Sequence, residues 1–264
     1  MMKIGFIGMG NMASAIAGGF IGSGKAKAED IYAYAPSKEK LLKNSKDLGF
    51  IPCADNREVC EKSDIVVIAC KPYQIKDALS GLKDELKDKA IVSIAAGYLN
   101  KTYKDLLGDD KRILCIMPNT PAMVGEGVFL FEEGNTLKKE EYDCIYDLFS
   151  SIGVIETVPS ELMGIGGAIS GCGPAFVDLF MEAYADAAVK YGIKRDMAYS
   201  LIAQTVLGSA KLMQVTGEHP GVLKDAVCSP KGTTIRGVAA LEEAGFRNAC
   251  IKSVDAVMDF KKNG

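Results

Sequence analysis

Short apolar runs alternate with amphipathic stretches over the first 157 residues or so of the chain. The runs lie at residues 3–7, 31–35, 65–70, 91–95, 113–117 and 127–131. Two segments, 65–69 and 90–94, are apolar almost throughout, which is typical of central parallel strands that helices cover on both faces. This rhythm predicts an α/β fold with a doubly wound, Rossmann-type sheet.

The strand rhythm stops at about residue 160, and the remaining sequence has helical patterns. Helices are predicted at 160–169, 174–191, 196–215, 220–227, 232–243 and 247–262. We therefore expect a Rossmann domain over 1–159 and an all-helical domain over 160–264. Within the latter, 185–189 and 198–208 are richer in small apolar residues than one face of a surface helix requires. This predicts burial against another subunit in a homo-oligomer.

Composition and charge narrow the class of partner. The net charge is −3, and the Lys and Arg residues are dispersed, so no basic patch indicates binding to nucleic acid or to an anionic membrane. No apolar run is judged to approach the roughly 20 residues that span a bilayer, and Met1-Met2-Lys3 leads into a strand rather than a signal peptide. These features predict a cytoplasmic protein with small-molecule partners.

The cysteine pattern favours structural thiols over a metal site. The eight cysteines include no C-x-x-C pair and no compact Cys/His group. Several lie inside apolar stretches, as Cys70 and Cys115 do, where a reduced cysteine behaves as a small hydrophobic residue. We expect buried thiols, a reducing compartment and no metal.

A glycine motif follows the first apolar run. Gly8-Met9-Gly10-Asn11-Met12-Ala13 has the G-x-G-x-x-A spacing between a predicted strand and a helix rich in small residues. Gly8 permits a tight turn, Gly10 lets backbone N–H groups approach a pyrophosphate, and Ala13 lets the helix and strand pack closely. Because a helix N-terminus also favours an anion, this placement predicts a dinucleotide site.

The ends of the later strands should line the same crevice, because ligands bind at the carboxyl edge of an open α/β sheet. These ends are the turn at 35–37, Cys70-Lys71-Pro72, Ala95-Ala96-Gly97 and the segment 117–121.

The second predicted strand bears on the choice of dinucleotide. It ends in Ala35-Pro36-Ser37-Lys38, without the acidic residue that accepts hydrogen bonds from an NAD ribose. Ser37 and Lys38 could hold a 2′-phosphate, so NADPH is favoured and NADH is the alternative. In the plainer interpretation, Ser37 only caps the next helix and Lys38 is solvated.

The candidate reaction groups are few. The one histidine, His219, lies in a turn between predicted helices, where a capping or surface role is expected, and Lys71 is interpreted as part of the cofactor loop. A carbonyl reductase usually needs a proton donor for the developing alkoxide. An imine removes that need, because its nitrogen can be protonated before hydride arrives.

A second loop has the composition of an anion site. Residues 229–234 read Ser-Pro-Lys-Gly-Thr-Thr and open a predicted helix, so free N–H groups and hydroxyls could face a substrate carboxylate. The alternative is a plain N-cap by Ser229 or Thr233.

Together these segments resemble the pyrroline-5-carboxylate reductase family along essentially the whole chain. The matching blocks are GMGNMA at 8–13, VIACKP at 67–72, SIAAG at 93–97, MPNTP at 117–121, AISGCGPAF at 168–176 and DAVCSPKGTTI at 225–235. The first block is shared by many dehydrogenases, whereas the last two are close to diagnostic. The resemblance implies an NAD(P)H-dependent oxidoreductase that acts on a C=N bond and converts Δ1-pyrroline-5-carboxylate to L-proline, the last step of proline biosynthesis.

The resemblance also implies roles for individual residues. It places NADPH on Gly8, Met9, Gly10, Asn11, Met12, Ser37, Asn56, Ala69, Cys70, Lys71, Pro72, Ala95, Ala96 and Gly97. It places the substrate on Met117, Pro118, Ser229, Gly232, Thr233 and Thr234. Within this set, the amides of Gly232 and Thr233 are expected to bind the carboxylate, and the Thr234 hydroxyl is expected to act as the catalytic group at the ring nitrogen. Family members form dimers that often assemble into pentamers of dimers.

The chain departs from the family pattern at two positions. Lys231 stands where many members have glycine, and we expect its side chain to point to solvent rather than to the carboxylate. Cys172 replaces a common serine.

Other functions are weighed against this one. A β-hydroxyacid dehydrogenase is disfavoured, because the helix after Gly173-Pro174 lacks the Lys and Asn, four residues apart, that such enzymes use. A non-catalytic dinucleotide sensor and a reductase of a related cyclic imine are the remaining alternatives.

Overall fold

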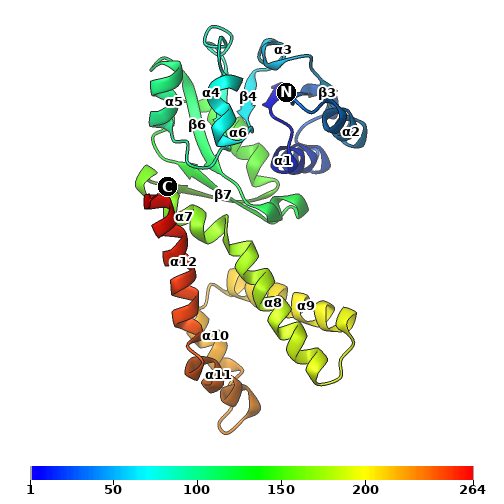
Figure 1. The fold of residues 1–264 in the computed structure, drawn as a ribbon, viewed down its shortest axis with the longest axis vertical. Helices are drawn as coiled ribbons and strands as arrows, with labels where there is room; N and C mark the ends of the chain where they lie inside the picture. The colour runs from blue at the N-terminus through cyan, green and yellow to red at the C-terminus, as the bar shows by residue number, and fades with distance from the viewer. Residues whose placement is uncertain (1, 264) are drawn as a thin grey trace. The chain divides into compact units, whose positions relative to one another are not determined.

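The protein divides into two compact units, Met1–Cys172 and Gly173–Gly264. The computed structural model describes residues 2–263, with side chains up to Phe260. The first unit contains a single eight-stranded sheet flanked by helices, and the second is helical (Figure 1). The α/β fold with a Rossmann-type sheet and a helical C-terminal part is thereby confirmed.

The sheet has the strand order β3-β2-β1-β4-β5-β6-β7-β8. The strands are β1 (Ile4–Ile7), β2 (Ile31–Tyr34), β3 (Ile51–Pro52), β4 (Ile65–Ile68), β5 (Ala90–Ser93), β6 (Arg112–Met117), β7 (Gly127–Glu132) and β8 (Gly153–Val158). Neighbouring strands are parallel except β6 and β7, which are antiparallel. The chain reverses its direction of travel across the sheet between β3 and β4, so the carboxyl ends of β1 and β4 form the switch point where ligands bind.

Helices cover both faces of this sheet. In the first unit they are α1 (Asn11–Gly22), α2 (Lys38–Leu48), α3 (Asn56–Lys62), α4 (Ile75–Ala78), α5 (Asn100–Leu107), α6 (Lys139–Ser150) and α7 (Met163–Ser170). Short 3-10 helices occur at η1 (Ala28–Asp30), η2 (Pro72–Gln74), η3 (Thr120–Val124) and η4 (Ser160–Leu162). One buried cluster joins α1, α2 and α6 to the sheet, and a second joins α3, α4 and α5.

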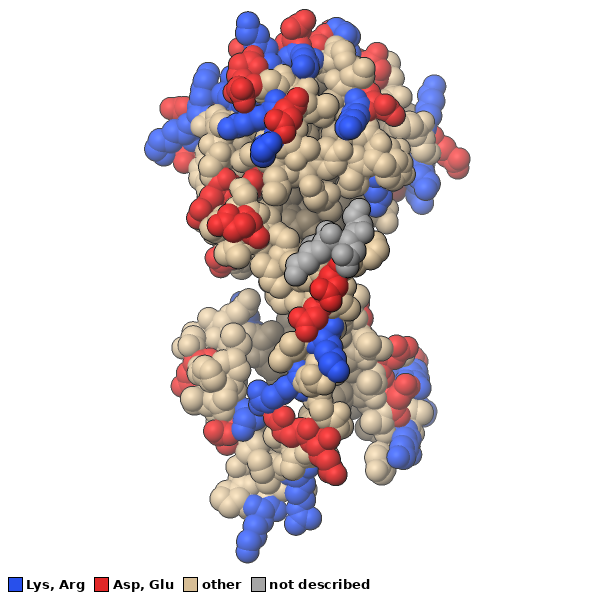
Figure 2. Space-filling view, turned by 60° about the vertical axis from the view of Figure 1, so that its left-hand side comes forward, with Lys and Arg blue, Asp and Glu red and all other residues tan. Residues whose placement is uncertain are grey.

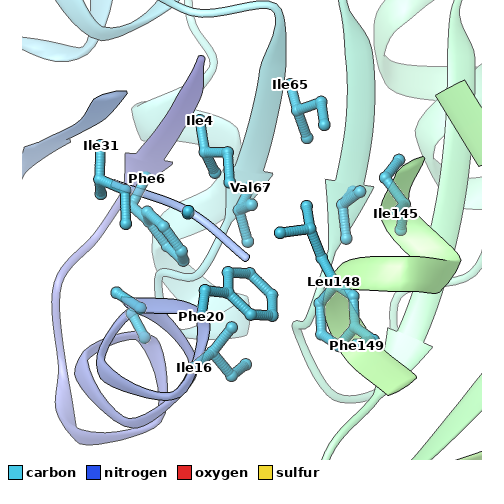
Figure 3. Packing of buried hydrophobic residues seen from close by; sticks show 14 of the residues in the cluster. Ile4, Phe6, Ile16, Phe20, Ile31, Ile65, Val67, Ile145, Leu148 and Phe149 are labelled. Carbon is cyan, nitrogen blue, oxygen red and sulfur yellow. The ribbon is translucent and has the colours of Figure 1, made fainter. Parts of the chain in front are cut away.

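The two clusters follow from the two-residue period of the strands. Ile65 and Val67 of β4 belong to the first cluster, whereas Val66 and Ile68 belong to the second. In the first cluster, shown in Figure 3, the rings of Phe20 and Phe149 meet edge to face with their centroids 5.2 Å apart. Both faces of this sheet are therefore buried within one chain.

The second unit consists of α8 (Gly173–Lys190), α9 (Arg195–Thr216), α10 (Pro220–Ala226), α11 (Thr233–Glu243) and α12 (Phe246–Asn263). Helix α8 packs on α9, and α11 packs on α12. Only Ala185 of α8 and Ala198 of α9 are buried in the described chain. The two helices expose large apolar side chains, among them Val177, Leu179, Leu201, Leu207, Leu212, Met213 and Val215.

Three sequence expectations need correction. Strands β3 and β8 were not among the predicted runs, and β7 runs antiparallel to β6 in a sheet that was expected to be parallel. Strand β3 is only two residues long and contains a proline, and β8 lies at the edge of the sheet with mostly exposed or half-exposed residues. Neither strand therefore has the continuous apolar pattern that identifies a central strand.

The third correction concerns Ser160–Lys190. This stretch is long and apolar enough to cross a membrane by length and composition, so the expectation of no such run is wrong. In the structure the stretch comprises η4, α7 and α8, with a turn at 171–172 between the two helices. Because α7 packs against β7, the two compact units divide after Cys172. The domain boundary between residues 159 and 160 stays a prediction.

Surface charge agrees with the dispersed pattern in the sequence. Figure 2 shows Lys and Arg side chains intermixed with Asp and Glu on the face in view. The lack of a nucleic-acid partner remains a prediction.

Candidate cofactor and substrate site

The turn between β1 and α1 is built for close approach to another chain segment and to a ligand. Gly8 has a φ of +97°, and a Cβ added there would lie 2.8 Å from the Cys70 backbone nitrogen, so only glycine fits without a shift of backbone. Two residues later, a Cβ on Gly10 would meet nothing within 4 Å. Gly10 is the N-cap of α1, no side chain caps that end, and the first turn has no acidic residue. The helix thus opens onto free space, which suits a pyrophosphate.

A cavity of about 530 Å³ lies beside this helix start. It is lined by residues at or beyond the carboxyl ends of β1, β4, β5 and β6, namely Gly10, Asn11, Met12, Ala13, Ala15, Ala69, Cys70, Lys71, Pro72, Ile94, Ala95, Ala96, Met117, Pro118, Thr120 and Met123. The structure therefore brings together most of the strand ends that were predicted to form one crevice. Of the predicted cofactor residues, five are not among the lining residues, namely Gly8, Met9, Ser37, Asn56 and Gly97.

Several lining residues were missed by sequence reasoning. Ala15 lies in the first turns of α1, Ile94 directly precedes the predicted Ala95-Ala96 pair, and Met123 lies in η3, whereas Thr120 belongs to the predicted segment 117–121. Their position in the sequence could have indicated them, because each lies within a few residues of a predicted strand end or of the glycine motif.

Ser37 is the N-cap of α2, but its side chain makes no capping hydrogen bond and the residue is exposed. Ser37 thus occupies the N-cap position, but its hydroxyl does not cap the helix as the plainer interpretation expected. Lys38 beside it is also exposed. One acidic residue, Glu39, lies in the first turn of α2, two positions after Ser37. A negative charge is therefore present near the end of β2.

Asn56 begins α3 and is tied to α4. Its Nδ2 donates to the Ala78 carbonyl at 3.0 Å, whereas its Oδ1 is buried without a partner among the described residues. One acceptor of this side chain is thus available.

The loop after β4 supplies an uncharged thiol and a lysine to the cavity wall. Burial raises the pKa of the Cys70 thiol, so this side chain is uncharged at neutral pH. The Lys71 N–H donates to Gln74 Oε1 at 3.3 Å, which closes the η2 turn, and Lys71 is itself exposed. Cys70 and Lys71 are the titratable residues among those that line the cavity.

The loop after β5 is held by a buried pair of hydroxyls. Ser93 Oγ lies 2.7 Å from Tyr103 Oη, and the Ala95 N–H donates to Ser93 Oγ at 3.3 Å. Burial raises the pKa of Tyr103 far above its usual value, so the phenol stays protonated as a hydrogen-bonding group. Gly97 has a φ of +80°, in the region that favours glycine.

The loop after β6 is fixed by Asn119, which is 6% exposed. Its Nδ2 donates to the Ser170 carbonyl at 3.1 Å, and its Oδ1 accepts from the Val128 N–H at 2.9 Å. This side chain joins the end of β6 to β7 and to the end of α7. Asn119 lay inside a matching sequence block, but nothing local indicated these partners.

In the second unit, residues 229–232 form a tight turn. The Gly232 N–H donates to the Ser229 carbonyl at 3.0 Å, and Lys231 has a φ of +60°, the conformation that a type II turn requires at its third position. A Cβ on Gly232 would lie 2.5 Å from Ser229 Oγ. The left-handed conformation explains why glycine suits position 231, and the Lys231 side chain is exposed in this chain, as expected.

Helix α11 starts directly after this turn. Gly232 is its N-cap, no side chain caps it, and no acidic residue lies in its first turn. Neither Ser229 nor Thr233 therefore acts as the plain cap that was the alternative. The amide of Gly232 is engaged with Ser229, whereas the first N–H groups of a helix, here those of Thr233 and Thr234, have no partner within it.

The chain is similar to proteins of one family over its full length. The family model for pyrroline-5-carboxylate reductase dimerisation matches residues 160–263, and that for NADP oxidoreductase, coenzyme F420-dependent, matches residues 3–97. Pyrroline-5-carboxylate reductase of Treponema pallidum (strain Nichols) is 40% identical over 97% of this chain and 99% of its own. The enzyme of Escherichia coli (strain K12) is 42% identical over 97% of this chain and 96% of its own.

Solved structures agree with these sequence matches. Plasmodium falciparum pyrroline carboxylate reductase with NADP bound has a TM-score of 0.90 and 34% identity, covering 99% of this chain and 97% of that one. The reductase of Streptococcus pyogenes has a TM-score of 0.87 and 30% identity, covering 100% of this chain and 99% of that one. The chain therefore belongs to the pyrroline-5-carboxylate reductase family.

Proposed function

We propose that this protein reduces the C=N bond of Δ1-pyrroline-5-carboxylate to give L-proline, the last step of proline biosynthesis, with NADPH as the hydride donor and NADH as the alternative. The observation that carries the proposal is the uncapped start of α1, which opens beside a cavity lined by residues from four strand ends. Family membership supports the reaction, and the structure with NADP bound supports the nucleotide.

The nucleotide fits the residues present. Free space at Gly10 and the absence of an acidic residue in the first turn of α1 leave room and favourable polarity for a pyrophosphate. We assign the pyrophosphate to residues 8–12, a 2′-phosphate to Ser37, and further contacts to Asn56, 69–72 and 95–97. When bound, NADPH supplies hydride, and the protein's own contribution is to hold and orient it.

The substrate assignments explain how the reaction proceeds without a strong acid. We assign the carboxylate to the loop that contains Ser229, Gly232 and Thr233. The engaged amide of Gly232 makes the N–H groups of Thr233 and Thr234 the better donors. Met117 and Pro118 shape the cavity wall. The Thr234 hydroxyl, as the catalytic group, would hydrogen-bond the ring nitrogen, which already carries its proton, so hydride arrival discharges a cation rather than creating an anion.

The assembly is proposed on separate evidence. The dimerisation model over 160–263 and the apolar side chains exposed on α8 and α9 support a homodimer. We further propose that dimers assemble into a decamer, that Ser160–Lys190 serves this assembly rather than a membrane span, and that the enzyme is cytoplasmic and does not bind nucleic acid.

A Thr234→Ala variant distinguishes the reductase from a dinucleotide sensor. Loss of a hydrogen bond between a hydroxyl oxygen and a charged N–H donor costs about 1.5–3 kcal/mol, so kcat should fall by about 10–10²-fold, and the nucleotide site should be unaffected. We expect that loss in NADPH oxidation with pyrroline-5-carboxylate, at unchanged NADPH affinity. Wild-type-like turnover by the variant would remove Thr234 from the mechanism. Reduction of another cyclic imine, but not of pyrroline-5-carboxylate, by the wild type would favour the related reductase.

A further inference from the structure

Glu132 is a buried carboxylate with no ionic partner among the described side chains. It is the last residue of β7 and is 2% exposed. Its Oε2 accepts from the Asn100 backbone N–H at 2.9 Å, and its Oε1 accepts from Ser160 Oγ at 2.5 Å. Burial, reinforced by Glu132, also raises the pKa of the nearby Cys115 thiol. A buried carboxylate is costly unless such donors satisfy it, so this arrangement requires an explanation.

The explanation lies at the start of α5. The N-cap there is Leu99, no local side chain caps the helix, and no acidic residue lies in the first turn. The side chain of Asn100 does not help, because both its polar atoms are buried without a partner among the described residues. Glu132, 32 residues further along the chain, therefore provides the negative group at this helix end.

This contact fixes one end of a loop that lines the cavity. The segment between β5 and α5 runs from Ile94 to Leu99, and Ile94, Ala95 and Ala96 line the cavity. The loop is held at its first end by the Ser93–Tyr103 hydroxyl pair. At its other end the Glu132 carboxylate holds the Asn100 amide. Without Glu132, that end would retain no side-chain cap.

We propose that Glu132 is a positioning residue for the nucleotide, because it fixes the 94–99 loop to β7 and, through Ser160, to η4. The inference rests on the proposed function only in taking a nicotinamide dinucleotide as the occupant of the cavity. Its effect on the reaction passes through the loop, since its own carboxylate oxygens are occupied by Asn100 and Ser160.

The test compares Glu132→Gln with Glu133→Gln in the full chain. Glu133 is the next residue and is exposed, so its variant makes the same chemical change without touching the buried contacts. We expect Glu132→Gln to raise the Kd for NADPH, titrated by fluorescence without substrate, about tenfold, which corresponds to about 1.4 kcal/mol. The KM for NADPH should rise in parallel while kcat changes less than about twofold.

Hydrogen exchange in the absence of nucleotide gives an independent result. Amides of 94–107 should exchange faster in Glu132→Gln, while those of α2 keep their wild-type rates. An unchanged Kd, or faster exchange spread evenly over the whole sheet, would overturn the positioning role. Ser160→Ala removes a single hydrogen bond and should change Kd in the same direction but less, so it replaces Glu132→Gln if that variant does not fold.

The two proposals fail in different ways. A wild-type chain that binds NADPH but does not reduce pyrroline-5-carboxylate would refute the proposed function and leave the Glu132 comparison intact. Normal turnover together with equal NADPH affinity in both glutamate variants would refute only the role of Glu132.

Discussion

The sheet unit and the helical unit treat their apolar side chains in opposite ways. In the first, Phe6, Phe129 and most strand residues are almost fully buried by helices on both faces. In the second, Leu179 and Val215 are 66% and 73% exposed, although α8 packs on α9. A sheet covered on both sides completes its core within one chain, whereas exposed apolar helix faces require a partner. Apolar side chains thus specify a nucleotide-binding fold in one region and an assembly surface in the other.

The largest effect is expected from a charge placed on the helical surface. Leu207 of α9 is 58% exposed in the single chain, so Leu207→Glu costs that chain little. Burying the unpaired charge in an interface costs several kcal/mol, so the dissociation constant of the dimer should rise roughly a hundredfold or more. Light scattering across a dilution series measures this change. Gln204→Glu adds the same charge at another exposed position on α9, and equal dissociation of both variants would not support a specific apolar interface.

A smaller effect, confined to the sheet unit, is expected at Gly8. Its φ of +97° and the 2.8 Å approach of a Cβ to Cys70 mean that Gly8→Ala must move backbone at the cavity. We expect the Kd for NADPH to rise about tenfold or more, since a shift of this kind forfeits at least about 1.4 kcal/mol of binding. Gly24 is a matched control, because its φ is +74° but nothing lies within 4 Å of its Cβ. If Gly24→Ala weakens NADPH as much, general strain rather than the close approach explains the result.

The sheet unit should also lose stability in alkali. Burial raises the pKa of both Cys53 and Cys60 to about 11, from 9.0 in an exposed thiol. Between these values the unfolded chain has released the thiol protons while the folded chain still holds them. The free energy of unfolding therefore falls as pH rises from about 9 to about 11, and the contribution of the two thiols is fully present below pH 9. Urea unfolding over this range checks the fall. Cys60→Ala should flatten it, and an unchanged slope would show that Cys60 does not carry the effect.

The smallest effect is expected at Lys231. A non-glycine residue at a φ of +60° costs about 1–2 kcal/mol, so Lys231→Gly should raise the free energy of unfolding by somewhat less than that, because glycine adds unfolded-state entropy. The Lys231 side chain is exposed, so the KM for pyrroline-5-carboxylate should be unchanged. A rise in KM would instead place the ammonium group beside the substrate carboxylate.

The strand ends were predictable because each depends on a local pattern. An apolar run followed by glycine, proline or a small residue marks the edge of a parallel sheet, and the cavity brings together Gly10, Cys70, Ala95 and Met117 as expected. The helices of the second unit likewise agree with their predicted ranges within a few residues.

Other features depend on contacts that no local pattern contains. The antiparallel entry of β7 and the edge strand β8 are set by tertiary pairing. Glu132 and Asn100 are 32 residues apart, and Asn119 and Ser170 are 51 apart, so their hydrogen bonds leave no signal in residue spacing. The engagement of the Gly232 amide by Ser229 depends on backbone angles at Lys231, where the family pattern gave glycine.

One measurement tests the proposed reaction most directly. The purified full chain is mixed with racemic pyrroline-5-carboxylate and NADPH, with NADH in a parallel sample, and loss of the reduced-nicotinamide absorbance is followed together with product analysis. We predict rapid oxidation of NADPH, slower oxidation of NADH, and L-proline as the product. Tight NADPH binding without turnover of either nucleotide would contradict the assignment.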